Sequence, residues 1–327
     1  MNFTHFIKEI GRARDGSRDL DVEDAFQLYG AMLDGGVPEL ELGAIMLALR
    51  MKSESVSELL GFDNALAPRV YPLRAPDGGV RTVVIPTYNG ARRQPNLLPL
   101  LALLLQRFGV PVLLHGTLEG HGRVASAYVL RELGVLPSAT LAQAQLALET
   151  DKLAFVPTAV LSPGLATLLS LRNRLGVRNS SHIMAKLIDP FGGEALRLVS
   201  VSHPGYLDKL REFFVHTGAN ALLLRSTEGE AFANPQRRPQ LEYFHDGAVQ
   251  VLFEAEAGPI KSLPAQAAGH DAHTTAAWIK QALGGEVPLP LPLVNQLACC
   301  LYGTGYTQDM NQAKAIVAVE TGSLMPV

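Results

Sequence analysis

The sequence contains few cysteines, few aromatic residues and no long apolar run. Its two cysteines, Cys299 and Cys300, are neighbours and provide neither a disulfide framework nor a metal cage, which suits a reducing cytoplasm. No apolar run approaches the roughly 18 residues that span a bilayer, so we expect no membrane partner. Residues 1–16 interleave charged and apolar side chains, unlike the apolar core of a signal peptide. We therefore expect a globular, cytoplasmic protein.

Several ligand-binding motifs are also absent. No G-x-G-x-x-G or G-x-x-x-x-G-K-[ST] follows a predicted strand, so neither dinucleotide nor P-loop nucleotide binding has support. Two short clusters carry metal-ligating side chains but lack a second ligand pair at metal spacing, so we expect structural roles and no metal. These clusters are His115, Glu119 and His121, and the run from His270 to His273.

Charge is unevenly distributed along the chain. The formal net charge is −3, which indicates no general attraction to nucleic acid. Residues 81–124 nevertheless contain five arginines and one acid, whereas residues 239–327 contain three lysines and eight acids. Either ordinary scatter over solvated faces or a local basic surface explains this distribution.

The first sixty or so residues predict four helices joined by short connections. Apolar residues recur at helical spacing in residues 3–10 and again after Asp19 or Asp21, where Gly35 and Gly36 end the pattern. Pro38 suits the first turn of a third helix, which continues to residue 49. The sequence Ser-Val-Ser-Glu at residues 55–58 has the capping-box form and opens a fourth.

From Arg81 onward, strands alternate with helices. At 327 residues and 47% hydrophobic content the chain can hold two domains, and the alternation predicts an α/β fold with a mostly parallel central sheet. The expected strands are Thr82–Ile85, Val110–Leu114, Leu153–Val156, Arg197–Val201, Ala221–Leu224 and Val249–Phe253. Expected helices include Asn96–Phe108, Gly122–Leu133 and Pro204–Val215.

Cationic and amide side chains recur where the predicted strands end. The carboxyl ends of parallel strands are where ligands bind in such sheets, and guanidinium groups match phosphate oxygens. We expect a nucleic-acid contact surface formed by Arg92, Arg93, Arg172, Arg174, Arg178 and Lys186. Tyr88, which could stack on a base, Asn89, and the weaker candidates Arg123, Arg225, Arg237, Arg238 and Lys52 complete it.

The order of segments resembles the anthranilate phosphoribosyltransferase and pyrimidine-nucleoside phosphorylase superfamily over nearly the whole chain. The segments that carry the likeness are ALRMKSESVSELLGF, IPTYNGARRQPNLLPLLALLL, VPVLLHG, RLGVRNSSHIMAKLIDP, HPGYLDKL and LLLRSTEGEAFANP. More narrowly, the chain resembles the divergent YbiB-type branch, whose members keep the transferase fold and are described as nucleic-acid-binding.

The resemblance implies a small helical domain and a larger α/β domain. The helical domain comprises residues 1–66, joined by helices of about residues 162–188, and the α/β domain comprises residues 75–327. The resemblance also implies a homodimer formed mainly through the helical domain, in which two basic surfaces would join into one longer groove.

The chain departs from the transferases where these hold sugar pyrophosphate and magnesium. Their glycine-rich phosphate loop corresponds to residues 86–90, Pro-Thr-Tyr-Asn-Gly, where proline lacks an N–H and a tyrosine side chain hinders close approach. Their magnesium-binding Asp-Glu pair aligns with Leu223 and Leu224, which cannot ligate a hard cation. Their Lys-His-Gly-Asn-Arg loop appears at residues 114–118 without either cation.

Some family positions are retained. Thr87, Gly90, Asn96, His115 and Gly116 match the transferase pocket, and Arg172 matches an arginine that contacts the aromatic acid there. We expect a vestigial pocket without catalytic residues or cofactor, in a protein that binds DNA, or RNA, through phosphate contacts. One alternative is a phosphoribosyltransferase that uses phosphoribosyl pyrophosphate and magnesium. Another is a structural dimer without a ligand.

Overall fold

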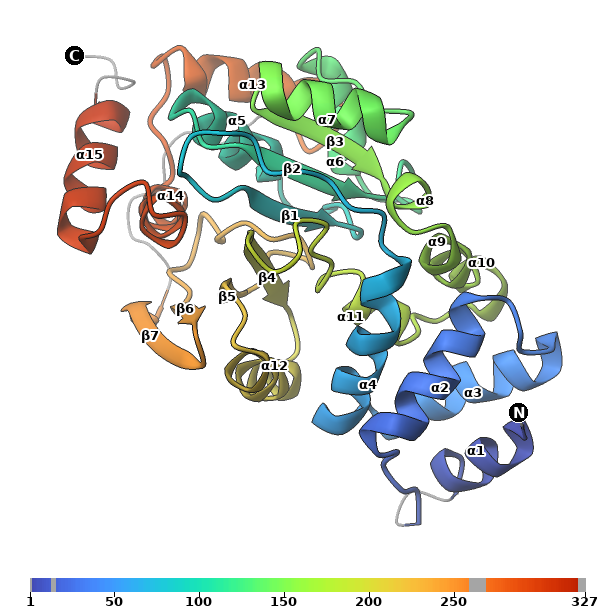
Figure 1. The fold of residues 1–327 in the computed structure, drawn as a ribbon. Coiled ribbons are helices and arrows are strands. Elements are labelled where there is room, and N and C mark those ends of the chain that lie inside the picture. Colours follow the sequence, from blue (N-terminus) through green and yellow to red (C-terminus); the bar gives the residue numbers. More distant parts are fainter. Residues whose placement is uncertain (1, 13–15, 259–268, 323–327) are drawn as a thin grey trace. The chain divides into compact units, whose positions relative to one another are not determined.

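The computed structural model describes residues 2–12, 16–258 and 269–322, and this part of the chain forms two compact units (Figure 1). The helical unit comprises Met1–Pro72 and Thr158–Pro190, and the α/β unit comprises Leu73–Pro157 and Phe191–Val327. The chain therefore leaves the helical unit, builds the first three strands of the sheet, and returns to the helical unit before it completes the sheet.

The helical unit follows the capping signals of the sequence. Asp21 accepts a hydrogen bond from the N–H of Asp24 at the start of the second helix, and Ser55 and Glu58 form a capping box at the start of the fourth. Its helices are α1 (Phe3–Ile10), α2 (Val22–Leu33), α3 (Glu39–Lys52), α4 (Val56–Leu66), η1 (Ala67–Arg69), α8 (Thr158–Leu161), α9 (Pro163–Ser170), α10 (Arg172–Leu175) and α11 (Ser181–Met184).

The α/β unit is built on a seven-stranded sheet in the order β3-β2-β1-β4-β5-β6-β7. The first five strands in this order are parallel, and β6 and β7 add an antiparallel edge. The strands are β1 (Val83–Thr87), β2 (Val112–Gly116), β3 (Leu153–Pro157), β4 (Leu196–Val201), β5 (Ala221–Arg225), β6 (Leu241–His245) and β7 (Ala248–Phe253).

Helices cover both faces of this sheet. The helices of the α/β unit are α5 (Leu98–Arg107), α6 (Ser126–Glu132), α7 (Leu141–Thr150), α12 (Pro204–Thr217), α13 (Ala272–Leu283), α14 (Leu291–Gly303) and α15 (Met310–Gly322). Helices α5, α6 and α13 lie on one face, whereas α12 packs against β4, β5 and β6 on the other (Figure 1). The predicted fold class is therefore confirmed. None of the helices in the described residues is long and apolar enough to span a membrane.

Candidate binding site at the carboxyl ends of the strands

The segment after β1 lies at the point where the strand order reverses. From β1 the chain builds outward to β2 and β3 on one side, and then to β4 and β5 on the other. Ligand crevices of open α/β sheets form at the carboxyl ends of strands at such a reversal. Pro86, expected in a loop, instead lies within β1 and is paired in register with His115, so the loop begins only at residue 88.

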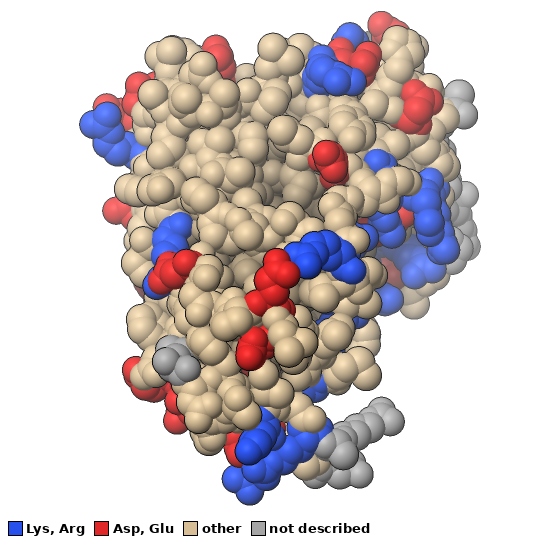
Figure 2. Space-filling model, turned by 90° about the vertical axis from the view of Figure 1, so that its right-hand side faces the viewer, with Lys and Arg blue, Asp and Glu red and all other residues tan. Residues whose placement is uncertain are grey.

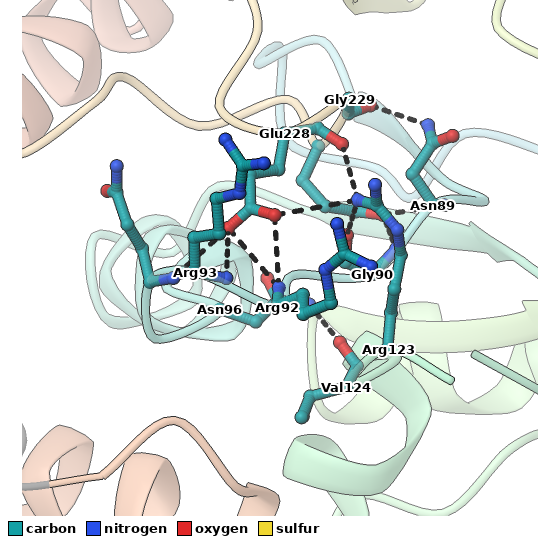
Figure 3. Close-up of polar contacts among 11 residues, drawn as sticks. Asn89, Gly90, Arg92, Arg93, Asn96, Arg123, Val124, Glu228 and Gly229 are labelled. Carbon is teal, nitrogen blue, oxygen red and sulfur yellow. Dashed lines mark hydrogen bonds and ion pairs between the residues drawn. The ribbon is translucent and has the colours of Figure 1, made fainter. Parts of the chain in front are cut away.

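Two carboxylates from the segment after β5 accept hydrogen bonds from the backbone N–H groups of this loop (Figure 3). Glu230 Oε1 accepts hydrogen bonds from the backbone N–H of Asn89 and Gly90, at 2.8 and 2.6 Å. The carboxylate of Glu228 accepts from the N–H groups of Arg92 at 3.1 Å, Arg93 at 2.7 Å and Gln94 at 3.0 Å.

These contacts define the N–H cradle, which we name for the backbone N–H groups of residues 89, 90 and 92–94. Consecutive backbone N–H groups that converge on one position form an anion-binding concavity. Proline lacks an N–H and a tyrosine side chain was expected to hinder close approach to this loop, yet five other N–H groups converge here. The anions that they bind are the protein's own carboxylates, and Glu230 is fully buried.

Further contacts hold the cradle in shape. Arg123 Nη1 donates to the carbonyl oxygens of Gly90 and Glu228, at 3.3 and 3.2 Å, and lies 3.6 Å from the Glu228 carboxylate. Asn89 Nδ2 donates to the carbonyl of Gly229 at 2.8 Å. Gly90 has a φ of +65°, and a Cβ there would lie 2.8 Å from the carbonyl oxygen of Val124. Arg123 and Asn89, expected to contact nucleic acid, therefore serve the loop itself.

The retained pocket residues are turned into the protein. Thr87 Oγ1 lies 2.7 Å from Ser126 Oγ, and Asn96 Nδ2 donates to the same hydroxyl at 3.0 Å. Gly116 lies so close to β1 that a Cβ there would be 1.7 Å from the Thr87 carbonyl oxygen. The side chains of Thr87 and Asn96, like that of His115, are buried.

Tyr88 is not placed to stack on a base. Only 5% of its surface is exposed, and its hydroxyl is hydrogen-bonded to Nδ1 of His115 at 2.7 Å. Complete burial lowers the pKa of His115 to about 3, so this imidazole is neutral at physiological pH. The expectation that Tyr88 contacts nucleic acid is wrong, because its ring is part of the core beneath the loop.

Arg92 and Arg93 differ from their neighbours in the loop. Both side chains are exposed, and neither guanidinium has a hydrogen-bond or ion-pair partner among the described residues. Their backbone N–H groups are held by Glu228 (Figure 3), so the loop is anchored while both side chains are exposed.

The helical unit contains a second group of predicted cations. The charges of Arg178, Arg172 and Lys186 act on His182, and together with burial, which is the larger cause, they lower the pKa of that imidazole to about 3. We name Arg172, Arg178 and Lys186 the His182 cation cluster. Its members come from α10 and from the segments on either side of α11.

Two predicted cations of the helical unit are engaged elsewhere. Arg174 forms two hydrogen bonds with the carboxylate of Glu39, at 3.0 and 3.2 Å. The side chain of Lys52 is only 6% exposed and lies between Asp19 and Glu58, with its Nζ 2.8 Å from the Glu58 carboxylate. Lys52 is therefore a structural residue, contrary to the prediction.

The remaining candidates, Arg225, Arg237 and Arg238, line a separate cavity at the end of β5. The basic side chains therefore form separate local groups and not one continuous basic surface on the face described next. On the face drawn in Figure 2, Lys and Arg side chains form several separate groups, some beside acidic side chains, on a surface that is mostly uncharged.

Glu228 and Glu230 were not predicted from the sequence. The carboxylate pair of the transferases aligned with Leu223 and Leu224, which are buried inside β5, whereas the acids of this chain follow that strand in the sequence Ser-Thr-Glu-Gly-Glu. The signal in the sequence that could have identified them is a pair of acids on either side of a glycine, just beyond a buried strand. Among the described residues no group of three or more His, Cys, Asp or Glu side chains could hold a metal.

Comparison with known proteins identifies relatives for both units. Residues 8–67 match the family described as glycosyl transferase family, helical bundle domain. The protein of Escherichia coli strain K12 named uncharacterized protein YbiB is 44% identical over 318 residues, which cover 97% of this chain and 99% of the relative. Anthranilate phosphoribosyltransferase of Methanosphaerula palustris is 27% identical over 324 residues, 97% of this chain and 94% of that one.

Solved structures share the fold at lower identity. The anthranilate phosphoribosyltransferase of Thermus thermophilus superposes with a TM-score of 0.77 and 22% identity, over 99% of this chain and 95% of that chain. The anthranilate phosphoribosyltransferase of Saccharomyces cerevisiae, solved in complex with PRPP and Mg, gives a TM-score of 0.73 and 13% identity, over 98% of this chain and 94% of that chain.

Proposed function

This chain belongs to the YbiB-type branch of the anthranilate phosphoribosyltransferase and nucleoside phosphorylase superfamily, and on that premise we propose that it is a non-catalytic nucleic-acid-binding protein. The observation that carries the proposal is the loop after β1, where the backbone donors are bound by internal carboxylates while Arg92 and Arg93 are exposed.

The filled N–H cradle argues against transfer chemistry on a sugar pyrophosphate. A diphosphate needs donors and a cation to stabilise its charge, and one lost donor costs about 3 kcal/mol in the transition state. Here the donors bind Glu228 and Glu230, and these carboxylates would repel a diphosphate. Magnesium requires oxygen ligands with open positions. Leu223 and Leu224 provide none, and Glu228 and Oε1 of Glu230 are engaged with N–H groups. The buried Oε2 of Glu230 is one oxygen alone, so the residues present do not fit this ion.

The cations suit a phosphate backbone. Arg92 and Arg93 offer planar, bidentate donors on an anchored loop, which reduces the conformational entropy lost when they bind. The His182 cation cluster provides a second concentration of positive charge, on the helical unit. Binding of this kind is electrostatic, tolerant of sequence and weakened by salt.

We also propose that the chain acts as a homodimer through its helical unit. Three apolar side chains on α3 are unusually exposed: Leu40 at 82%, Leu47 at 44% and Met51 at 85%. Their spacing of seven and four residues places them on one face of the helix, as expected for a stripe that packs against a second helix. Sedimentation of the wild type and of Leu40→Glu/Met51→Glu tests this, and a wild type that stays monomeric at all concentrations would refute it.

The test of nucleic-acid binding is fluorescence anisotropy with a labelled single-stranded oligonucleotide across a salt series. Wild type is compared with Arg92→Ala/Arg93→Ala and with the control Arg50→Ala/Arg74→Ala, which removes the same charge from two other exposed positions. Two lost phosphate contacts reduce the slope of log affinity against log salt by about 1.4 for a single strand. An unchanged slope and affinity in the loop variant would remove Arg92 and Arg93 from the site.

A second arm separates this function from the transferase alternative. Phosphoribosyl pyrophosphate with magnesium leaves the melting temperature unchanged if the cradle is closed, because only a ligand that binds the native state stabilises it. A clear rise in melting temperature would favour the phosphoribosyltransferase instead.

A further inference from the structure

A cavity of about 590 Å³ lies in the α/β unit at the end of β5. Its walls come from α12, from the end of β5, from the segment before β6 and from the segment after β7. This volume is within the range of about 300–1,000 Å³ that is typical of small-molecule sites. The cavity is separate from the N–H cradle, none of whose residues lines it.

Two guanidinium groups in the cavity wall have no partner among the described residues. Arg225 is the last residue of β5, and its side chain is exposed. Arg237 is also exposed and is presented by a turn in which its N–H donates to the carbonyl of Asn234 at 3.1 Å. The side chain of Asn234 accepts from the N–H of Gln236 at 2.8 Å and fixes that turn.

The carboxylates of the cavity wall are already engaged. Glu242 accepts from Arg211 Nε at 2.9 and 3.0 Å and from Gln240 at 3.2 Å, and Glu256 is bound to Arg238. They therefore neutralise Arg211 and Arg238 and leave Arg225 and Arg237 uncompensated.

Two further polar atoms of the wall are buried without a partner in the described residues. These are the hydroxyl of Ser226 and Nε of Arg238. A buried donor without a partner costs free energy, which a bound acceptor recovers. The unsatisfied groups of the cavity are thus cations and donors, and the chemistry that satisfies them is an anion with several oxygens.

We propose that this cavity binds a small organic phosphate through its phosphate monoester. A monoester carries about −1.5 to −2 charges at pH 7, which two uncompensated guanidiniums balance, whereas a diester carries only one. Leu207, Leu224 and Pro239 form an apolar part of the wall, against which a sugar or ring packs. A free nucleotide and the terminal phosphate of a nucleic-acid strand both present this chemistry.

Calorimetric titration of the full chain with adenosine monophosphate, inorganic phosphate and adenosine tests the proposal. We expect adenosine monophosphate to bind more tightly than either part alone, and Arg225→Ala/Arg237→Ala to weaken it by at least about 10- to 100-fold. Neither guanidinium has a structural partner in the described residues, so the variant should have the same melting temperature as the wild type. Equal binding of nucleotide and nucleoside, or unchanged binding in a folded Arg225→Ala/Arg237→Ala protein, would overturn the proposal.

A second comparison identifies the source of the phosphate. If a strand end is the ligand, an oligonucleotide with a 5′-phosphate or 3′-phosphate binds more tightly than one with hydroxyl ends, and Arg225→Ala/Arg237→Ala removes the difference. If a free nucleotide is the ligand, the end group has no effect while the monophosphate still binds. Arg92→Ala/Arg93→Ala is the control, because it weakens polymer binding and leaves nucleotide binding intact, so each proposal can fail alone.

Discussion

Replacing Glu228 with alanine should open part of the N–H cradle. The carboxylate accepts hydrogen bonds from three N–H groups, and its side chain is only 13% exposed. Hydrogen bonds to charged groups contribute about 1.5–3 kcal/mol each. Because Arg92 and Arg93 are exposed, water can reach the freed donors, and we expect a total loss of about 2–4 kcal/mol. For a unit of this size the melting temperature should fall by roughly 5–12 °C.

The same variant should gain an affinity for anions that the wild type lacks. Inorganic pyrophosphate without metal is expected to raise the melting temperature of Glu228→Ala, since a ligand at 100 times its Kd recovers about 2.7 kcal/mol. Glu212→Ala is the control, because this glutamate is exposed on α12 and its loss should change stability by less than about 0.5 kcal/mol. Equal pyrophosphate shifts in wild type and variant, or a Glu228→Ala protein as stable as the control, would refute the reasoning.

Three further substitutions test the surrounding structure by urea denaturation. Gly90→Ala should cost about 1–3 kcal/mol more than Gly176→Ala, because both have positive φ but only the first is crowded by a carbonyl oxygen; equal losses would contradict this. Lys52→Met should cost about 3–5 kcal/mol by leaving the buried Glu58 unpaired, without changing nucleic-acid affinity; a loss of affinity would restore its predicted role. Since burial holds the pKa of His115 near 3, the unfolded chain binds a proton below about pH 6.5 that the folded chain does not. Stability should therefore fall as pH drops from 6.5, by about 2 kcal/mol at pH 5 from this group, and His115→Gln should remove that part of the slope.

The sequence predicted the parallel core because its strands are short apolar runs bounded by turn residues. Five of the expected strands overlap β1 to β5 and the sixth overlaps β7, each within two residues at either end. Ser55 marked a helix start correctly, and Asp21, one of two candidates for the start of the second helix, is its N-cap, since both side chains bond locally to the backbone. Apolar runs and capping bonds involve residues that are close together in the chain, so both can be recognised from the sequence alone.

Strand β6 was missed for a physical reason. Its sequence, Leu-Glu-Tyr-Phe-His, has a charged residue at its second position and therefore forms no continuous apolar run. Glu242 is nevertheless buried, because Arg211 on α12 neutralises it. A pairing between residues 31 positions apart is not visible in the sequence of either segment.

The candidate site was predicted in position but not in its contacts. Strand ends located the loop after β1, and the prediction that Arg92 and Arg93 bind nucleic acid remains to be tested. Which side chain fills the cradle depends on a segment about 140 residues further along the chain, and only the folded sheet brings Glu230 to Gly90. Proline and tyrosine in the loop suggested lost donors, although Pro86 belongs to the strand.

The two glutamates of the cradle also constrain how this protein can evolve. Glu228 and Glu230 bind different N–H groups, so losing either one frees only its own part of the cradle and leaves the other carboxylate bound in the rest. Each loss alone lowers stability before any new ligand compensates for it. A variant chain that came to bind pyrophosphate here would have to pass through less stable intermediates, so selection for folding acts against opening the cradle.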